Sequence, residues 1–439
     1  MMKNNYLPEA LKLTGIDPFP YQWEGVKALA SKRRYLIRDE PGLGKTIQCI
    51  VAANVIGHEK DLKILVLTTV SMVQTWKREV MKWATCGNYT VINHDKFASK
   101  DRDQYIRKWD LVICDEAHLY LRNRDTIRAK TFLEILLGDP IVWMATATPA
   151  NKSAEDYYLM LKILLPKMYW KMNKTDFVKE YCCVEQDEFF SKAPKRGMKC
   201  IKAGSVYRCF IQKFTGFKNV EKLNKVLGSC SIKRTEGEVN LQLPELTFTS
   251  QYLDVPFSTL SVEEAEEIKR AVFEGRELGD GYHDKMREAA LSKVASVLDI
   301  LSTYPTDKKV VIFAWHRDVV ETLTEKISES GRACDYIHGG TSEANRVKIM
   351  DAFQTGELNT LVINMKSGGV GITLTAATCG IYVQFPYSAD QWQQSMKRIH
   401  RIGSKKPVQI IKLIAAGSID EDIWEILSER LEKIKEIEG

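Results

Sequence analysis

A stretch with the composition of a phosphate-binding loop, DEPGLGKTIQ, occupies residues 39–48. Gly42 and Gly44 let the backbone curl so that its N–H groups point inward at phosphate oxygens. The apolar residues that follow Lys45 predict a helix, whose positive N-terminal end favours an anion. A short apolar run at 35–37 predicts a strand before the loop. Strand, glycine-rich turn and helix follow in the order that a phosphate site requires.

Two side chains of this loop have defined roles in nucleotide chemistry. Lys45 is placed to reach the β- and γ-phosphates of a nucleoside triphosphate, and the Thr46 hydroxyl to bind Mg²⁺. Asp39 stands where the strict pattern has its first glycine. The alternative of a Gly-rich turn that binds nothing therefore stays open on these residues alone.

A pair of carboxylates ends the apolar run DLVICDEAH at residues 110–118. Asp115 can hold Mg²⁺ directly or through water, and Glu116 can act as the general base or orient the attacking water. An Asp-Glu pair after a strand is weakly specific by itself. Together with the preceding loop, it indicates hydrolysis of a nucleoside triphosphate.

Two arginines in the second half of the chain are candidates to complete such a site. In QWQQSMKRIHRIG (391–403), Arg398 and Arg401 are three residues apart, which predicts that they share one face of a helix. Two guanidinium groups from a second domain that reach the γ-phosphate form an arginine-finger arrangement. The alternative is an exposed basic helix, which Gln394 and the Gly-rich segment upstream disfavour.

A possible adenine contact lies near the N-terminal end, in PFPYQWEGVKAL (18–29). Pro20 is a start signal for a helix. Gln22, preceded by Tyr21, offers one acceptor and two donors, which suits the Hoogsteen edge of adenine. On sequence alone, a surface glutamine is at least as good an interpretation.

Strands and helices alternate in both halves of the chain. Apolar runs predict strands at 63–70, 91–95, 110–118 and 141–149, and again at 310–318, 361–377 and 380–386. Polar residues follow the strands, which predicts parallel α/β sheets with ligands beyond the carboxyl ends of the strands. The tail from residue 419 predicts a charged amphipathic helix.

The segment between the two halves is basic. Lys167 to Arg234 contains 16 basic and 6 acidic residues, an excess larger than the net charge of +6 of the whole chain. We expect helical pieces from about 152 to 240, with aromatic residues among the bases. LQLPEL (241–246) is the predicted connector to the second half.

The composition limits the class of protein. A chain of 439 residues with 44% hydrophobic and 27% charged residues indicates a globular protein of at least two domains. The ten cysteines predict thiols in a reducing compartment, and a zinc site in the basic segment is the weaker alternative because paired C-x-x-C spacing is lacking. Because the start lacks a signal-peptide pattern and no apolar run approaches about 20 residues, we expect an intracellular soluble protein. The compartment would be the cytoplasm, the cytoplasm of a virus-infected host, or the nucleus of a eukaryote.

The motifs together resemble the Swi/Snf-type family of superfamily-two helicase-like ATPases, in the family's order over nearly the whole chain. The likeness rests on YQWEG (21–25), DEPGLGKTIQ (39–48), DEAH (115–118), ATATPAN (145–151), HGGTSEANR (338–346), SGGVGITLTAA (367–377) and QSMKRIHRIG (394–403). Asp39 is normal in the family's version of the loop. The stretches at 214–239 and 313–323 resemble the compact annealing-helicase branch. Ala147, Ser404 and PYSADQW depart from the pattern, at positions that bear on substrate coupling and subfamily.

The resemblance implies an α/β fold of two RecA-like lobes with parallel sheets and a helical protrusion inserted between them. The first, ATP-binding lobe would span 1–240, with the basic helical insert at about 152–240, and the helicase C-terminal lobe would span 241–439. The implied cofactors are ATP and Mg²⁺, with Thr46 and Asp115 as metal ligands. The implied catalytic residues are Lys45, Asp115, Glu116, Arg398 and Arg401. The implied nucleotide-binding residues are Tyr21, Gln22, Gly42, Leu43, Gly44, Lys45, Thr46, Gly369, Gly371 and Gln394.

The resemblance further implies a DNA-dependent ATPase that moves along double-stranded DNA without separating its strands. Such an enzyme would remodel DNA or protein–DNA complexes, with annealing and branch migration among the open roles. The grip on the duplex would come from phosphate contacts, for which the candidates are Ser71, Lys77, Asn93, His316, Arg317, Lys366 and Ser367. We expect a monomer with no membrane partner and no small-molecule substrate beyond ATP.

Two other functions are compatible with parts of the sequence pattern. An RNA helicase of the DEAH type is disfavoured by the glutamine motif and by the Swi/Snf-like motifs of the second half. A DNA-binding protein with a vestigial ATP site is disfavoured because every expected ATP-site residue is present.

Overall fold

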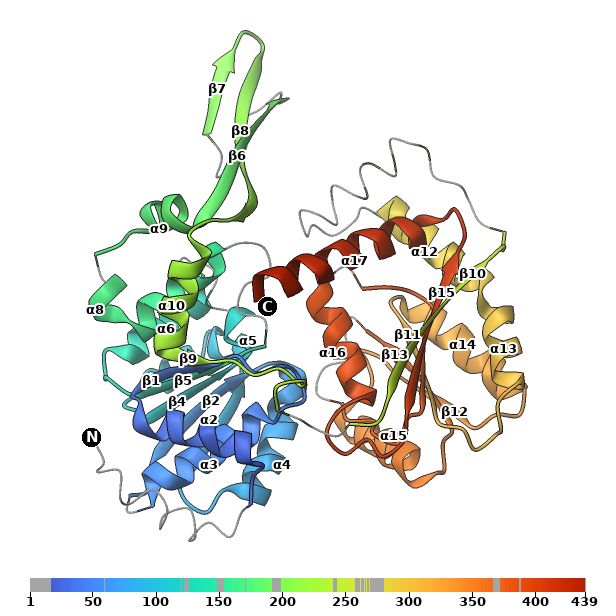
Figure 1. Ribbon diagram of the computed structural model, residues 1–439, viewed down its shortest axis with the longest axis horizontal. Coiled ribbons are helices and arrows are strands. Elements are labelled where there is room, and N and C mark those ends of the chain that lie inside the picture. Colours follow the sequence, from blue (N-terminus) through green and yellow to red (C-terminus); the bar gives the residue numbers. More distant parts are fainter. Residues whose placement is uncertain are drawn as a thin grey trace. The chain divides into compact units, whose positions relative to one another are not determined.

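The computed structural model describes residues 17–438, apart from 59, 120, 122–125, 148–153, 170, 192–198, 240–242, 257–260, 262–263, 265, 267, 269–279, 366–371 and 387. The chain forms two compact units (Figure 1). One consists of Met1–Glu40 and Gly44–Val239, and the other of Pro41–Leu43 and Asn240–Gly439. Each unit contains a six-stranded sheet.

The sheet of the first unit is entirely parallel. Its strands, in spatial order, are β3 (Asn88–Asn93), β2 (Lys63–Thr68), β4 (Leu111–Asp115), β5 (Ile141–Ala145), β1 (Arg34–Ile37) and β9 (Ser231–Ile232). The carboxyl ends of parallel strands meet at one edge of the sheet, so the segments that follow β1, β4 and β5 are brought together there. The strand expected before the phosphate loop and the four others expected in this unit are confirmed, as β1 to β5, whereas β9 was not anticipated.

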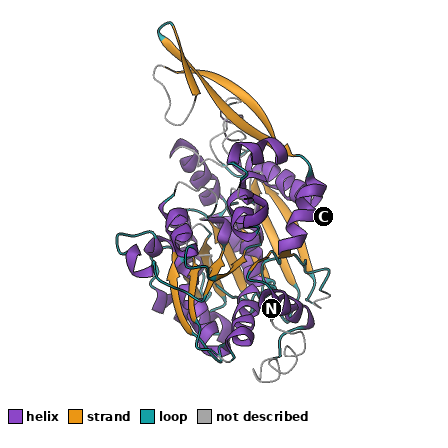
Figure 2. Cartoon of the chain, turned by 90° about the vertical axis from the view of Figure 1, so that its left-hand side faces the viewer, coloured by secondary structure: helices purple, strands orange, loops and turns teal. Residues whose placement is uncertain are grey.

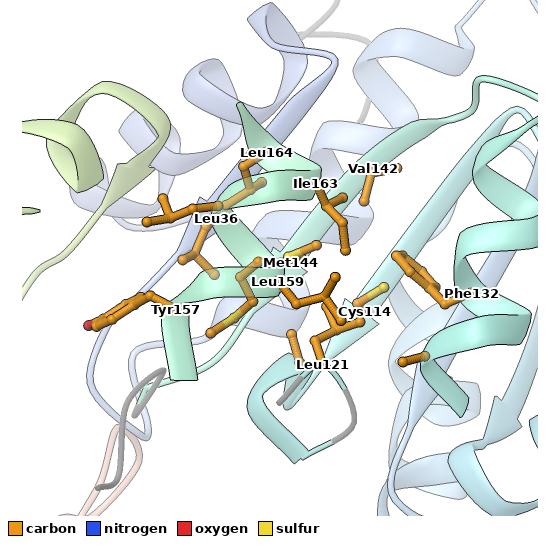
Figure 3. Close-up of a cluster of buried hydrophobic side chains, with 14 of the residues drawn as sticks. Leu36, Cys114, Leu121, Phe132, Val142, Met144, Tyr157, Leu159, Ile163 and Leu164 are labelled. Carbon is orange, nitrogen blue, oxygen red and sulfur yellow. The ribbon is translucent and has the colours of Figure 1, made fainter. Parts of the chain in front are cut away.

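Helices cover both faces of this sheet. They are α2 (Pro20–Ser31), α3 (Lys45–Gly57), α4 (Val73–Trp83), α5 (His94–Phe97), α6 (Ile127–Leu136) and α7 (Tyr157–Leu164). Because successive strand residues point to opposite faces, Ile113 packs with α2, α3 and α4, while its neighbour Cys114 packs with α5, α6 and α7. Figure 3 shows the second of these cores, where Phe132 and Leu159 lie near Cys114.

The basic insert of the first unit contains both helices and strands. The expected helices are present as α8 (Pro166–Tyr169), α9 (Lys174–Tyr181) and α10 (Val220–Cys230). Between α9 and α10 the chain forms a three-stranded antiparallel sheet, with β8 (Val206–Phe217) between β6 (Cys182–Ser191) and β7 (Lys199–Ala203). This sheet stands away from the body of the unit (Figures 1 and 2). It was not anticipated, although β8 is rich in the aromatic and β-branched residues that favour strands.

The expectation that the cysteines are free thiols is wrong for one cysteine of this small sheet. Cys209 on β8 is disulfide-bonded, and the strand register places Cys200 of β7 opposite it. Cys182 and Cys183, at the start of β6, are free. Among the described residues, no group of three or more His, Cys, Asp or Glu side chains is arranged to hold a metal ion.

The second unit repeats the parallel α/β architecture. Its strands, in spatial order, are β10 (Leu246–Leu253), β15 (Val408–Ala415), β14 (Cys379–Tyr382), β11 (Val310–Ala314), β13 (Thr360–Asn364) and β12 (Cys334–Ile337). Its helices include α12 (Asp280–Ser292), α13 (Val294–Ser302), α14 (Arg317–Glu329), α15 (Glu343–Thr355), α16 (Ala389–Ile399) and α17 (Ile419–Glu438). The fold class of two α/β lobes with parallel sheets is therefore confirmed, although β10 and β15 were not anticipated.

The C-terminal helix α17 is fastened to this sheet by a buried ion pair. The ammonium of Lys293 donates to Asp420 Oδ2 at 2.5 Å and to the carbonyl of Leu413 at 3.1 Å, and both charged side chains are almost fully buried. Removing either partner would leave an uncompensated buried charge, so the start of α17 is held firmly. No helix in the described part of the chain is long and apolar enough to span a membrane.

Candidate active site

The phosphate loop has the backbone geometry that its glycines predict. Gly42 and Gly44 have φ angles of +93° and +75°, in the left-handed region that glycine enters without strain. Gly44 is the N-cap of α3, which begins at Lys45. The amide groups at the start of α3 therefore face the end of β1, where an anion is favoured.

The ammonium of Lys45 lies against its own loop. It donates to the carbonyl oxygens of Asp39, at 2.8 Å, and Glu40, at 3.3 Å. A phosphate group at the loop would compete for this ammonium with two neutral acceptors. Thr46 is the second residue of α3, so its hydroxyl group is carried by the same helix N-terminus.

Asp115, the last residue of β4, is held by two donors that sequence reasoning missed. Its Oδ2 accepts the hydroxyl of Thr68 at 2.9 Å and the indole N–H of Trp76 at 2.8 Å. Thr68 ends β2, the strand beside β4, and Trp76 on α4 is fully buried. Burial raises the pKa of the Asp115 carboxyl, while these hydrogen bonds and the charge of Lys45 lower it. The oriented carboxylate, like the hydroxyl of Thr46, is an oxygen ligand of the kind that Mg²⁺ prefers.

Glu116 adopts a backbone conformation that is uncommon for a residue with a side chain. Its φ angle is +50°, and such outliers concentrate at functional sites. Its Oε2 lies 3.4 Å from Nδ1 of His118. The same Nδ1 lies 2.7 Å from the hydroxyl of Thr146, just after β5. The segments after β4 and β5 are thereby linked through His118.

The candidate adenine contact is buried beneath the phosphate loop. Gln22 is 4% exposed, so the alternative of a surface glutamine is wrong. Its Oε1 accepts the N–H of Phe19 at 3.1 Å, and its Nε2 donates to the Tyr21 hydroxyl at 3.3 Å. A Cβ added to Gly44 would lie 2.4 Å from this Nε2. The glycine is therefore required by close packing as well as by its φ angle.

The two candidate arginine fingers lie in the second unit, and the expectation of one shared helical face is wrong. Helix α16 ends at Ile399, so Arg398 lies in its last turn and Arg401 lies beyond the C-cap His400. Their side chains reach the same segment nevertheless, because Arg398 Nη1 donates to the Ile372 carbonyl at 3.5 Å and Arg401 Nη1 to the Thr373 hydroxyl at 3.0 Å. The helix stops because Ser404 holds the following turn, accepting the N–H of Arg401 at 3.1 Å.

Of the other candidate residues on the glycine-rich segment and on α16, only Gln394 lies in the described part of the chain. Gln394 is half-buried on α16. Gly369, Gly371, Lys366 and Ser367 lie outside the described residues.

The structure separates the candidate DNA contacts into exposed and internal residues. Lys77 on α4 is exposed, and Arg317 at the start of α14 is exposed with an ion pair to Glu321 at 2.8 Å. Asn93 instead caps α5, its Oδ1 accepting the N–H of Lys96 at 2.7 Å. Ser71 lies in a short 3₁₀ turn, Val70–Met72, before α4.

His316 belongs to an internal network. Its Nδ1 lies 2.8 Å from the amide nitrogen of Gln384, and its Nε2 lies 3.0 Å from His283. Burial, reinforced by His283, lowers the pKa of His316 to about 4. A neutral ring with internal partners is a poor phosphate ligand, so the geometry disfavours His316 as a DNA contact.

Two family models match the chain. Residues 21–107 and 85–263 match the SNF2-related domain, and residues 292–403 match the helicase conserved C-terminal domain. Human "DNA annealing helicase and endonuclease ZRANB3" is 25% identical over 97% of this chain and 40% of its own length. A Caenorhabditis elegans homologue of "SWI/SNF-related matrix-associated actin-dependent regulator of chromatin subfamily A-like protein 1" is 24% identical over 99% of this chain and 65% of its own length.

Among solved structures, the Pyrococcus furiosus Hef helicase domain has a similar fold. The TM-score is 0.52 with 14% sequence identity, and the match covers 93% of this chain and 98% of that domain. This likeness concerns the fold alone. The chain spans about two fifths of the length of the ZRANB3 relative.

Proposed function

We propose that this chain, which belongs to the SNF2-related domain family, is an ATP-dependent motor that moves along double-stranded DNA. One observation carries the proposal. At one edge of a parallel sheet, a phosphate loop with Lys45 lies with an Asp115 carboxylate that Thr68 and Trp76 orient. A loop for phosphate beside an oriented carboxylate for Mg²⁺ is the arrangement that hydrolysis of a nucleoside triphosphate requires.

The residues of the first unit divide the work of hydrolysis among them. Lys45 and the amides of the loop bind the phosphates, and Glu116 accepts the proton of the attacking water. Thr46 and Asp115 would hold Mg²⁺, which supplies positive charge to the phosphate oxygens. Tyr21 and Gln22, beneath the loop, would recognise adenine.

Residues of the second unit would complete the reaction. Arg398 and Arg401 would stabilise the charge that develops on the transferred phosphoryl group, as arginine fingers do. Gly369, Gly371 and Gln394 would contribute to the nucleotide site. Because Arg398 and Arg401 belong to a different unit from Lys45 and Asp115, hydrolysis would depend on closure of the two units around ATP.

Double-stranded DNA is proposed as the track. The relatives are named as annealing helicases or as regulators of chromatin, which supports a DNA substrate. Among the candidate contacts, the exposed Lys77 and Arg317 are the ones whose geometry suits phosphate binding, with Ser71, Lys366 and Ser367 as further candidates. Such contacts carry no sequence information and weaken as salt rises. The proposed role is the remodelling of DNA or protein–DNA complexes by a monomer.

The test measures ATP hydrolysis with no nucleic acid, duplex DNA, single-stranded DNA or RNA. Duplex DNA should stimulate hydrolysis most. Lys45→Ala and Glu116→Gln should each abolish turnover while duplex binding persists, because neither residue is a DNA contact. Stimulation by RNA alone would favour an RNA helicase. Unchanged turnover in both variants would contradict the assigned ATP site.

A further inference from the structure

A buried arginine to which the sequence assigned no role, Arg234, holds the start of the phosphate loop. Arg234 follows β9 and is 7% exposed. Its Nε donates to Asp39 Oδ1 at 3.0 Å and its Nη2 to Asp39 Oδ2 at 2.6 Å. This is a two-point pairing of guanidinium and carboxylate, the strongest form of such a contact. Asp39, the residue in place of the first glycine, is fully buried.

The same guanidinium also holds the helix that follows the loop. Its Nη2 donates to Gln48 Oε1 at 2.7 Å, and Gln48 Nε2 donates to Asp39 Oδ2 at 2.9 Å. Gln48 lies on α3, one turn beyond Gly44. Asp39 before the loop and Gln48 after it are therefore tied to one cation, which closes the loop across its base.

Backbone contacts fix this arginine in place. The N–H of Arg38 donates to the Ile232 carbonyl at 2.8 Å, and the N–H of Glu40 to the Arg234 carbonyl at 3.0 Å. Segment 231–234 thus runs alongside the chain that enters the loop. This backbone pairing fixes the main chain of Arg234, so the guanidinium starts from a rigid position beside the loop.

The guanidinium extends the clamp to the helix that carries the candidate adenine contact. Nη1 of Arg234 donates to the Tyr21 carbonyl, and the guanidinium carbon lies 5.2 Å from the centre of the Tyr21 ring. A Cβ at Gly25, on the same helix, would lie 1.8 Å from Gln48 Oε1 and 2.8 Å from Arg234 Nη2. Only glycine leaves room there for the clamp.

We propose that Arg234 is a positioning residue that sets the affinity of the phosphate loop for ATP by holding Asp39 and Gln48 at its two ends. This inference rests on the proposed ATP site at Lys45. Without the clamp the two ends of the loop are free to separate, and the amides and Lys45 no longer converge on the phosphates. Arg234 touches no reacting atom, so its loss should raise KM for ATP more than it lowers kcat.

The experiment measures the binding of ATP with Mg²⁺ by calorimetry, together with KM, kcat and thermal unfolding. Arg234→Met and Asp39→Asn should each weaken ATP binding about tenfold or more, as losses of supporting contacts commonly do. The double variant should bind ATP no more weakly than the worse single variant, because both changes break one clamp. Arg234→Lys should fall between Arg234→Met and the wild type, since an ammonium cannot make the two-point pairing.

Two variants keep the result interpretable. The double variant leaves no unpaired buried charge, so it should fold even if a single variant does not. Arg38→Met is the matched control, because the Arg38 guanidinium donates to Ser231 on the same strand pair, at 2.9 Å, and leaves Asp39 untouched. Its ATP affinity should stay within about twofold of the wild-type value, because this change removes no contact to Asp39 or Gln48.

The outcomes separate this inference from the proposed function. If Lys45→Ala weakens ATP binding but the folded double variant binds ATP like the wild type, the clamp has no role in positioning and the inference fails alone. If Lys45→Ala itself leaves ATP binding unchanged, the proposed ATP site is at fault. A lower melting temperature of the clamp variants with an unchanged KM would assign Arg234 a purely structural role.

Discussion

At the scale of single residues, buried side chains hold two carboxylates of the proposed ATP site in place. Trp76, a fully buried residue of α4, uses its indole N–H to hold the Asp115 carboxylate. Arg234, to which the sequence assigned no role, pairs with Asp39 in the same unit. Such supporting contacts orient metal ligands and tune their affinity. The sequence singled out Asp115 and Asp39, but it did not reveal the side chains that hold them.

The role of Trp76 can be tested by Trp76→Phe, which keeps a large aromatic ring and removes the N–H donor. We expect kcat to fall about tenfold and the Mg²⁺ concentration for half-maximal rate to rise, because the carboxylate loses one orienting bond. ATP hydrolysis measured across a Mg²⁺ titration checks both values.

Trp143→Phe is the matched control for this prediction. Trp143 is also fully buried, and its indole donates to the Lys32 carbonyl at 3.2 Å, away from Asp115. It should change stability without changing the dependence on Mg²⁺. Identical Mg²⁺ curves for Trp76→Phe and the wild type would show that the indole bond has no catalytic consequence.

Arg401 is predicted to act on the transition state rather than on ATP binding. Arg401→Ala should lower kcat by roughly 10³ while ATP affinity stays within a few-fold, as expected of an arginine finger. Single-turnover hydrolysis and equilibrium ATP binding separate the two effects. Lys405→Ala removes an exposed charge four residues away and should leave kcat unchanged. A normal kcat in Arg401→Ala would give this arginine a structural role at Thr373.

At the scale of elements, hydrophobic patterning predicted most strands of the two large sheets but missed β9, β10 and β15. The runs ending at Asp115 and Ala145 are continuous apolar segments, which is typical of strands covered on both faces. β9 has only two residues and is specified by its pairing with β1, a tertiary contact that no local pattern encodes. The break of α16 at Ile399 likewise depends on Ser404, whose hydroxyl group holds the turn.

The insert shows the same limit in another form. Its charge and its scattered aromatic residues suggested solvated helices, and α9 and α10 are indeed helical. The intervening sheet is stabilised because β8 pairs with both β6 and β7. These two partner strands lie at different distances from β8 along the chain. Strand propensity was visible in β8, but the partners were not.

The lowered pKa of His316, at the junction between β11 and α14, makes the free energy of unfolding depend on pH. His316 there has a pKa lowered from 6.5 to about 4 by burial and by His283, with Arg287, Asp318 and Gln384 as its other neighbours. Between these values the unfolded chain binds more protons than the folded one, so the free energy of unfolding falls as the pH is lowered from 6.5 to 4. The loss attributable to this ring is about 1 kcal/mol after allowance for its partial exposure.

Urea unfolding at several pH values of the wild type and His316→Asn checks this prediction. The variant should lose less stability than the wild type between pH 6.5 and 4. His58→Asn, at an exposed position, should show the wild-type slope. Equal slopes for wild type and His316→Asn would contradict the assigned shift.

At the scale of the whole molecule, the proposed catalytic residues are divided between two α/β units. The first unit carries Lys45, the proposed metal ligands and the proposed general base, and the second carries the proposed arginine fingers. In the proposed cycle, ATP draws these groups together and hydrolysis releases them, so that each turnover advances the protein along the duplex. The domain limits of 1–240 and 241–439 and the monomeric state remain predictions of this scheme.

Triplex displacement tests most directly whether the protein moves along duplex DNA when it hydrolyses ATP. A short third strand is annealed to duplex DNA, and its release is followed with and without ATP for the wild type and Glu116→Gln. A motor that moves along duplex DNA should release the third strand only with ATP, leave the underlying duplex paired, and lose this activity in the variant. Separation of the duplex strands, or vigorous ATP hydrolysis on duplex DNA with no release of the third strand, would contradict the account.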